Sequence, residues 1–226
     1  MPITWLVAGV AVALLDWLAT ALSWHRVRCL SKPLVLVCLI AWVLTTGDRA
    51  QNLTLLALGL AFALVGDIFL LRPLLARVPS LFWAGLASFL VMQLLYTATL
   101  LDVPPPLNGK TALAVLLALL GLAVDVRLLL HSARTLRGWL RIPVLAYLGT
   151  LALMLGSALL LPARPEWSAL QAALVAGGAA LFFFSDSLLG YDRFVARVRH
   201  SELVTIITYH LGQFGIAGGV LLHAIV

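Results

Sequence analysis

The sequence predicts an all-α polytopic membrane protein, a bundle of eight transmembrane helices that forms a single domain over residues 1–226. Two observations favour this class. Of the residues, 63% are hydrophobic and only 11% are charged, whereas a soluble domain is about 45–50% apolar and about 25% charged. The mean hydropathy is +1.08. So few charges cannot cover a water-facing surface, which excludes a soluble globular protein and a disordered chain.

Hydrophobic runs bounded by charge, proline or glycine predict the individual helices. They cover residues 3–23, 33–46, 53–71, 81–100, 111–130, 142–161, 168–189 and 203–225. The second run is short, and Pro33 at its start suits the first turn of a helix. The runs are continuously apolar rather than alternating, which favours helices over a β-barrel. The first run is longer than the apolar part of a signal peptide, and no basic residue precedes it, so we expect it to be a span.

The basic residues predict how the chain crosses the bilayer. Lys and Arg gather in the odd-numbered loops, where they are Arg26, Arg28, Lys32, Arg72, Arg77, Arg127, Arg134, Arg137, Arg141, Arg193, Arg197 and Arg199. The even-numbered loops contain Arg49, Lys110 and Arg164. Because cytoplasmic loops are enriched in Lys and Arg, we expect the odd-numbered loops in the cytoplasm and both termini outside, in a bacterial cytoplasmic membrane.

The distribution of the basic residues also argues against binding of nucleic acid. The net charge is +6, but the basic residues are spread over the loops and form no basic domain, so we expect no nucleic-acid partner. Cys29 and Cys38 predict no disulfide framework. A metal held by Asp67, Asp186 and His210 is one alternative, but the sequence lacks any spaced His pair, so we expect no metal and no cofactor.

Two aspartates inside the hydrophobic runs are the main functional candidates. An ionisable group at the centre of a span costs roughly 2.5–3.5 kcal/mol or more. Asp67 is followed by Arg72 and Asp186 by Arg193, so we expect both carboxyl groups just inside the cytoplasmic boundary. The two segments that contain them, Gly66–Leu71 and Ser185–Gly190, are weakly similar to each other in sequence. Asp16 also lies within a run, but no motif surrounds it and we rank it lower.

Further polar side chains predict a pocket around these aspartates. Lys32 can approach the same depth, either to pair with a carboxylate or to bind a substrate phosphate. Small residues at helical spacing beside Asp67, namely Gly59, Ala63 and Gly66, would let neighbouring helices approach. The candidate substrate-binding residues are Lys32, Gln93, Tyr96, Ser185, Tyr209 and Gln213. Interhelical hydrogen bonding explains several of them equally well, and we interpret Asp125 and Arg127 as interfacial charges.

These residues resemble a known family. The chain is similar to the YhhN-like lysoplasmalogenase family of eight-span membrane proteins, through Lys32-Pro33, Gly66-Asp67, the stripe Phe82, Gly85, Phe89 and Tyr96, the run Ser185-Asp186-Ser187-Leu188-Leu189 with Phe194, and Thr208-Tyr209 with Gln213. Gln93 and His210 depart from the family pattern. The resemblance implies hydrolysis of the vinyl ether bond of lysoplasmalogens to a fatty aldehyde and a glycerophospho-base, with Asp67 and Asp186 as the catalytic acids.

Acid chemistry is consistent with that implication. Vinyl ethers are cleaved by protonation of the alkenyl carbon, followed by addition of water and collapse of the hemiacetal. One carboxylic acid and one carboxylate perform comparable steps in glycosidases. The sequence leaves open which aspartate is the acid. A single-chain ether phospholipid is the expected partner, together with the membrane lipid around it.

Two other function classes remain open from the sequence. Intramembrane carboxylates also mark proton and ion pathways, so a proton-coupled transporter is one alternative. A lipid-binding membrane protein without turnover is the other. Substitution of Asp67 by Asn separates them, because an enzyme would lose hydrolysis, a carrier would lose flux, and a scaffold would lose neither.

Overall fold

The computed structural model describes residues 2–46, 51–102, 104–131, 138 and 141–225. Within these ranges the regular structure is helical throughout and no strand occurs. The predicted all-α class is therefore confirmed. Arg49, Arg134 and Arg137, which the charge pattern used, lie outside the described residues.

Most of the described helices are long and apolar enough to cross a bilayer. Seven qualify: α1 (Pro2–Ala21), α2 (His25–Thr46), α5 (Leu81–Leu100), α6 (Gly109–His131), α7 (Arg141–Leu159), α8 (Ala169–Phe194) and α9 (Ser201–Ala224). Between them lies α3 (Gln51–Phe69), whose apolar part Leu53–Phe69 is shorter. The chain is a polytopic membrane bundle, in which these helices correspond to the expected spans.

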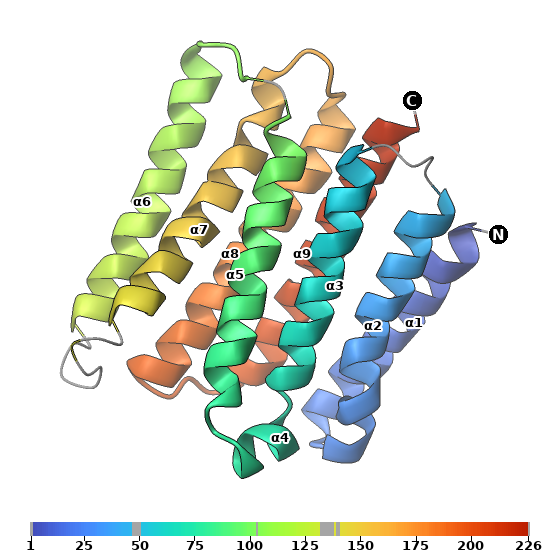
Figure 1. Cartoon of the computed structure of the whole chain (residues 1–226), viewed down its shortest axis with the longest axis vertical. Helices are drawn as coiled ribbons and strands as arrows, with labels where there is room; N and C mark the ends of the chain where they lie inside the picture. Colours follow the sequence, from blue (N-terminus) through green and yellow to red (C-terminus); the bar gives the residue numbers. More distant parts are fainter. Residues whose placement is uncertain (1, 47–50, 103, 132–137, 139–140, 226) are drawn as a thin grey trace. The chain divides into compact units, whose positions relative to one another are not determined.

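The chain divides into two compact units, which are described separately. The first comprises residues 1–99 and 224–226, and the second comprises residues 100–223. In the first unit, α1, α2, α3 and α5 run alternately up and down (Figure 1), and α2 packs against both α1 and α3. Leu36, Leu56, Leu60 and Met92 are fully buried in this unit.

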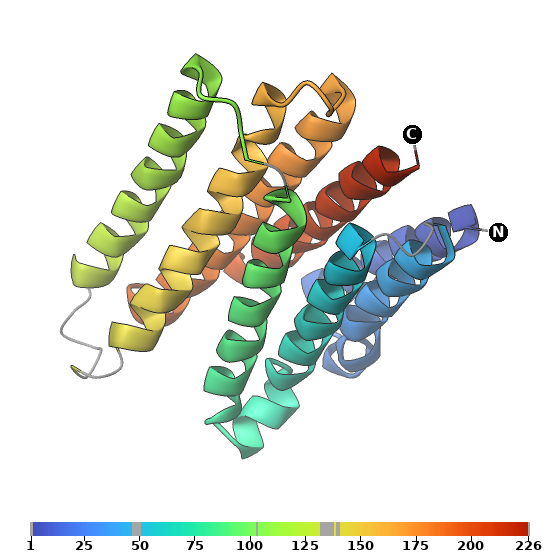
Figure 2. The same cartoon turned by 45° about the horizontal axis from the view of Figure 1, so that its top comes forward.

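The second unit is also built from antiparallel helices. Here α6, α7, α8 and α9 alternate in direction, and α7 packs against α6 and α8 in both views (Figures 1 and 2). Helix α8 begins with a capping box, in which Ser168 and Gln171 satisfy each other's backbone N–H groups. The side chain of Gln171 also donates to the Leu222 carbonyl at 2.9 Å, which ties the start of α8 to the end of α9.

The largest departure from the predicted elements concerns the second span. Helix α2 begins at His25 rather than at residue 33, and Pro33 lies inside it. Arg26, Arg28 and Lys32 therefore belong to the helix and not to a loop. The basic residues made the first turns look like a connection, but lysine and arginine are good helix formers, and a proline in the interior weakens a helix without necessarily ending it.

Two short helices were not predicted, and one predicted end is too early. Helix α4 (Arg72–Arg77) lies between α3 and α5, and the 3-10 helix η2 (Leu161–Ala163) follows α7. Each has a proline in its first turn, where the missing N–H costs nothing. Helix α8 continues to Phe194, five residues beyond the expected boundary at 189.

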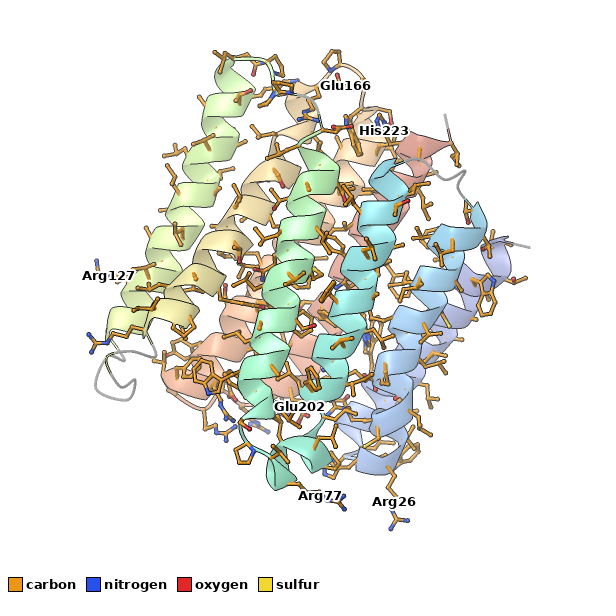
Figure 3. All side chains as sticks on the ribbon, in the orientation of Figure 1. Arg26, Arg77, Arg127, Glu166, Glu202 and His223 are labelled. Carbon is orange, nitrogen blue, oxygen red and sulfur yellow. The ribbon has the colours of Figure 1, made fainter. Side chains whose placement is uncertain are left out.

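Charged residues sit at the ends of both units. In the first unit, Figure 3 shows Arg26 and Arg77 at the same end. In the second, Arg127 and Glu202 lie at the end opposite to Glu166 and His223 (Figure 3). The two arginines of the first unit agree with the predicted clustering of basic residues, while the orientation of the chain in the membrane stays a prediction.

Candidate functional site

In the first unit, Asp67 and Lys32 form a buried ion pair. The Nζ atom of Lys32 on α2 lies 2.9 Å from an Oδ atom of Asp67 on α3, and the side chains are 15% and 1% exposed. Asp67 lies in the last turn of α3, where the helix dipole disfavours a negative charge. The ammonium of Lys32 offsets this cost and that of burial. The two predicted residues are therefore brought together.

Two glycines of α3 make room for aromatic rings of α5. A Cβ atom at Gly59 would lie 2.6 Å from Cδ1 of Tyr96, and one at Gly66 would lie 2.7 Å from Cε2 of Phe89. The absence of side chains at these two positions therefore makes room for the rings. Tyr96 is 1% exposed. The predicted close approach at the small residues of this span agrees with the structure.

Gln93 completes the polar part of α5. It is fully buried, and Thr97 one turn later donates its hydroxyl to the Gln93 carbonyl at 2.8 Å. Ser88 on the same helix donates to the Phe62 carbonyl of α3 at 2.7 Å. The first bond lies within α5, and the second joins α5 to α3. A role of Gln93 or Tyr96 in binding substrate stays a prediction.

A second buried carboxyl group, ranked low from the sequence, lies in the same unit. Asp16 on α1 is fully buried, and the hydroxyl of Ser31 on α2 donates to its Oδ1 atom at 2.5 Å. Ser31 directly precedes Lys32 in the sequence. Consecutive residues of α2 thus bind one carboxyl group on α1 and another on α3. The apolar sequence around Asp16 gave no motif, and only its charge could have drawn attention to it.

In the second unit, three consecutive residues of α8 each reach a different helix. Ser185 donates to the Thr205 carbonyl of α9 at 2.9 Å. The hydroxyl of Tyr147 on α7 donates to Asp186. Ser187 donates to an Oδ atom of Asp125 on α6 at 2.9 Å.

The serine–aspartate–serine segment of α8 thereby fastens α6, α7 and α9. Tyr147 was not among the predicted residues, because a lone tyrosine in an apolar run carries no signal. Asp125 is only 8% exposed and accepts a hydrogen bond from Ser187, whereas Arg127 is exposed. The position of both residues at the membrane interface stays a prediction.

The predicted residues of α9 lie against α8 at a contact made by glycines. Tyr209 is 4% exposed and Gln213 is fully buried, and the Tyr209 ring lies 5.7 Å from that of Phe182. A Cβ atom at Gly178 would lie 2.7 Å from the backbone nitrogen of Ile216, so the two backbones approach closely. Tyr209 and Gln213 face protein, and binding of substrate by them stays a prediction.

His210, which follows Tyr209 on α9, is the histidine considered as a metal ligand. His210 is fully buried, with its ring 5.5 Å from that of Tyr209. Over the part of the chain that the structure describes, no group of three His, Cys, Asp or Glu side chains is placed to hold a metal ion. The carboxyl groups of Asp67 and Asp186 can donate or accept a proton and can stabilise a positive charge.

The fold and these buried carboxyl groups define a class: a polytopic α-helical membrane protein with ionisable side chains inside its helices. Residues 27–220 match the YhhN family, and the chain belongs to that family. It is 31% identical over 193 residues to lysoplasmalogenase TMEM86B from Mus musculus, which covers 84% of this chain and 73% of the mouse protein.

The corresponding protein from Rattus norvegicus is equally similar. The chain is 32% identical over 193 residues to this lysoplasmalogenase TMEM86B, which covers 84% of this chain and 71% of the rat protein. No solved structure gives a significant match. The family that the sequence motifs suggested is thus confirmed.

Proposed function

We propose that this protein is a membrane lysoplasmalogenase, a hydrolase that cleaves the vinyl ether bond of a lysoplasmalogen to release a fatty aldehyde and a glycerophospho-base. The observation that carries the proposal is the similarity to two rodent lysoplasmalogenases over 84% of the chain. The buried carboxyl groups of a membrane bundle support it, because the substrate is a single-chain lipid and its cleavage requires an acid.

The reaction needs two different carboxyl functions. An acid donates a proton to the alkenyl carbon, and the adjacent carbon becomes an oxocarbenium ion. A carboxylate stabilises this cation and takes a proton from the water that adds to it. The resulting hemiacetal then loses the glycerol oxygen as an alcohol, which yields the aldehyde. The net change is addition of one water molecule across the cleaved C–O bond.

We assign the carboxylate role to Asp67 and the acid role to Asp186. Asp67 forms an ion pair with Lys32, so it is a carboxylate and a poor proton donor. The Tyr147 hydroxyl donates to Asp186, which is partly exposed. Contact with solvent lets a carboxyl group gain and lose a proton between steps. The ammonium of Lys32 is engaged by Asp67, which favours this role over binding of the substrate phosphate.

Aldehyde release tests the proposal directly. Purified protein in detergent is given a lysoplasmalogen, and aldehyde is measured for the wild type and for Asp67→Asn and Asp186→Asn. General acid–base groups contribute about 10²–10⁴-fold, so we expect each variant to lose at least a hundredfold in kcat. Asp192→Asn is the matched control, because Asp192 lies on the same helix as Asp186 and binds Ser201 and Arg197 instead. It should keep wild-type activity.

Two results would contradict the proposed activity or the assigned roles. No aldehyde from a folded wild-type protein overturns the vinyl ether activity, and proton-coupled flux in sealed vesicles would be measured next. Hydrolysis that survives in either Asn variant overturns the role of that residue. The double variant adds a further check, since groups that act as a unit give a loss close to that of one substitution alone.

A further inference from the structure

The turn of α2 that carries Lys32 is weakened by a proline. Pro33 has no N–H group, so it cannot donate to the carbonyl of Cys29 four residues earlier, and its ring crowds that carbonyl. Ser31 and Lys32 lie between these two positions. The backbone at this turn therefore needs another contact to stay in place, and the position of the Lys32 ammonium depends on it.

Helix α1 supplies such a contact. The Ser31 hydroxyl donates to Asp16 at 2.5 Å, and the two residues are 3% and 0% exposed. The connection between α1 and α2 is short and ordered: the Trp24 N–H donates to the Ala19 carbonyl at 2.7 Å, and Ser23 has a φ angle of 57°. The two helices thus pack as a hairpin, and the Asp16–Ser31 bond lies in its buried seam.

We propose that Asp16 is a positioning residue, which acts through Ser31 to hold the Pro33-weakened turn of α2 so that Lys32 stays on Asp67. Its catalytic consequence rests on the proposed function. The residues that match the YhhN family begin at position 27, so Asp16 and all of α1 precede the matched region. The N-terminal helix therefore contributes to the arrangement of the Lys32–Asp67 pair.

The chain contains its own reporter of this turn. Cys29 lies in the weakened turn and is partly exposed, and its thiol donates to the His25 carbonyl at 3.2 Å. Cys38 lies further along the same helix and is 4% exposed. Alkylation by a small maleimide, followed by mass spectrometry, gives the reaction rate of each thiol in the same sample. Cys38 thereby controls for general loosening of the protein.

Three variants test the contact without reference to activity. Asp16→Ala removes the acceptor, Ser31→Ala removes the donor, and Asp16→Asn keeps a carbonyl oxygen that can accept from Ser31. We expect Cys29 to react about threefold faster or more in both alanine variants, since local opening of the turn increases access to this partly exposed thiol. The asparagine variant should stay near the wild-type rate, and Cys38 should not change. Unchanged Cys29 rates in Ser31→Ala overturn the proposal even where Asp16→Ala does not fold.

Kinetics test the consequence for catalysis. We expect Asp16→Ala to lower kcat about tenfold with little change in KM, because a small displacement of a catalytic group has a large effect on rate. Asp16→Asn should restore most of the rate. Wild-type kcat in a folded Asp16→Ala variant contradicts the positioning role. If the wild type itself is inactive, the proposed function fails, and the Cys29 rates still decide whether Asp16 holds the turn.

A double variant tests whether Asp16 acts through Lys32. Once Lys32→Met has removed the ammonium, loss of Asp16 has nothing further to displace. Asp16→Ala added to Lys32→Met should therefore lower kcat less than it does in the wild-type background. Two losses that multiply in full would show that Asp16 affects the reaction by another route and would overturn the inference.

Discussion

The two predicted catalytic aspartates occupy different environments. Asp67 in the first unit is 1% exposed and paired with an ammonium at 2.9 Å. Asp186 in the second unit is partly exposed and bound by the hydroxyl of Tyr147. Burial raises the cost of a charge, which therefore requires a partner, whereas a partly exposed carboxyl group also keeps contact with solvent. The comparison indicates that similar sequence motifs surround two carboxyl groups that differ in exposure.

Two helix contacts made by glycines, one in each unit, also differ. In the first unit, Gly59 and Gly66 make room for the rings of Tyr96 and Phe89. In the second, Gly178 faces the backbone of α9, with the Gly212 carbonyl oxygen 2.8 Å from where its Cβ atom would lie. A ring can move aside, but two packed backbones cannot without separating the helices. The contact between α8 and α9 is therefore the more rigid of the two.

The largest expected effect on stability comes from Lys32. Replacing Lys32 with Met removes the ammonium from a carboxyl group that is 1% exposed, and breaking a buried ion pair typically costs about 3–5 kcal/mol in the free energy of unfolding. Adding Asp67→Asn should recover most of this loss of stability, although kcat should fall at least a hundredfold below that of the wild type. Unfolding in mixed detergent micelles measures the stability of the single and the double variant. A Lys32→Met protein as stable as the wild type would show that the pair does not stabilise the first unit.

Gly178→Ala tests the rigidity of the contact between α8 and α9. The new methyl group would meet the backbone of Ile216 at 2.7 Å, and overpacking of this kind costs about 1–3 kcal/mol. Gly177→Ala is the matched control, because its Cβ atom would meet nothing within 4 Å. There, the higher helix propensity of alanine should stabilise the protein by up to about 1 kcal/mol. Equal effects of the two substitutions on unfolding would contradict the close approach.

Gly66→Ala extends the same comparison to the first unit. Its methyl group would meet the far edge of the Phe89 ring at 2.7 Å, and the ring can turn away at modest cost. The gain in helix propensity, about 1 kcal/mol, should offset much of that cost, so we expect a smaller loss of stability than for Gly178→Ala. A larger loss than for Gly178→Ala would reverse our ranking of the two contacts.

Tyr147→Phe sharpens the comparison between the aspartates. It removes one hydrogen bond to a partly exposed carboxyl group, for which water can substitute, so we expect a stability change of only about 0.5–1.5 kcal/mol. Activity should fall about tenfold if Tyr147 orients Asp186, because each tenfold loss corresponds to about 1.4 kcal/mol in the barrier. Measuring kcat and KM separately checks this expectation. Unchanged kcat would show that the hydrogen bond does not serve the reaction.

The smallest expected effect is that of an exposed ion pair. Arg197 binds Asp192 at 3.1 Å, but its side chain is 87% exposed. Such pairs contribute little, because water and salt screen them. Arg197→Ala should therefore leave the unfolding midpoint unchanged, in contrast to Lys32→Met. A clear loss of stability would show that charge alone, rather than burial, controls the difference.

The sequence by itself determined the fold class, the apolar helices and the family. These follow from composition and from motifs such as Gly66-Asp67 and Ser185-Asp186-Ser187, because a bilayer requires long apolar helices. It also predicted that Lys32 can pair with a carboxylate at the depth of Asp67, because charged residues in apolar runs are conspicuous, and the structure shows the two side chains as an ion pair. The start of α2 was missed, because the basic residues before Pro33 resembled a loop.

Only the tertiary structure decided which polar groups meet. Asp16 with Ser31, Tyr147 with Asp186 and Asp125 with Ser187 are pairs from different helices. In a soluble helix the buried face shows as an apolar stripe. Here the outward side chains are apolar as well, as the 57% exposed Leu119 illustrates, so hydropathy does not reveal which way a residue faces. The partners of the buried acids therefore emerge only when the helices pack.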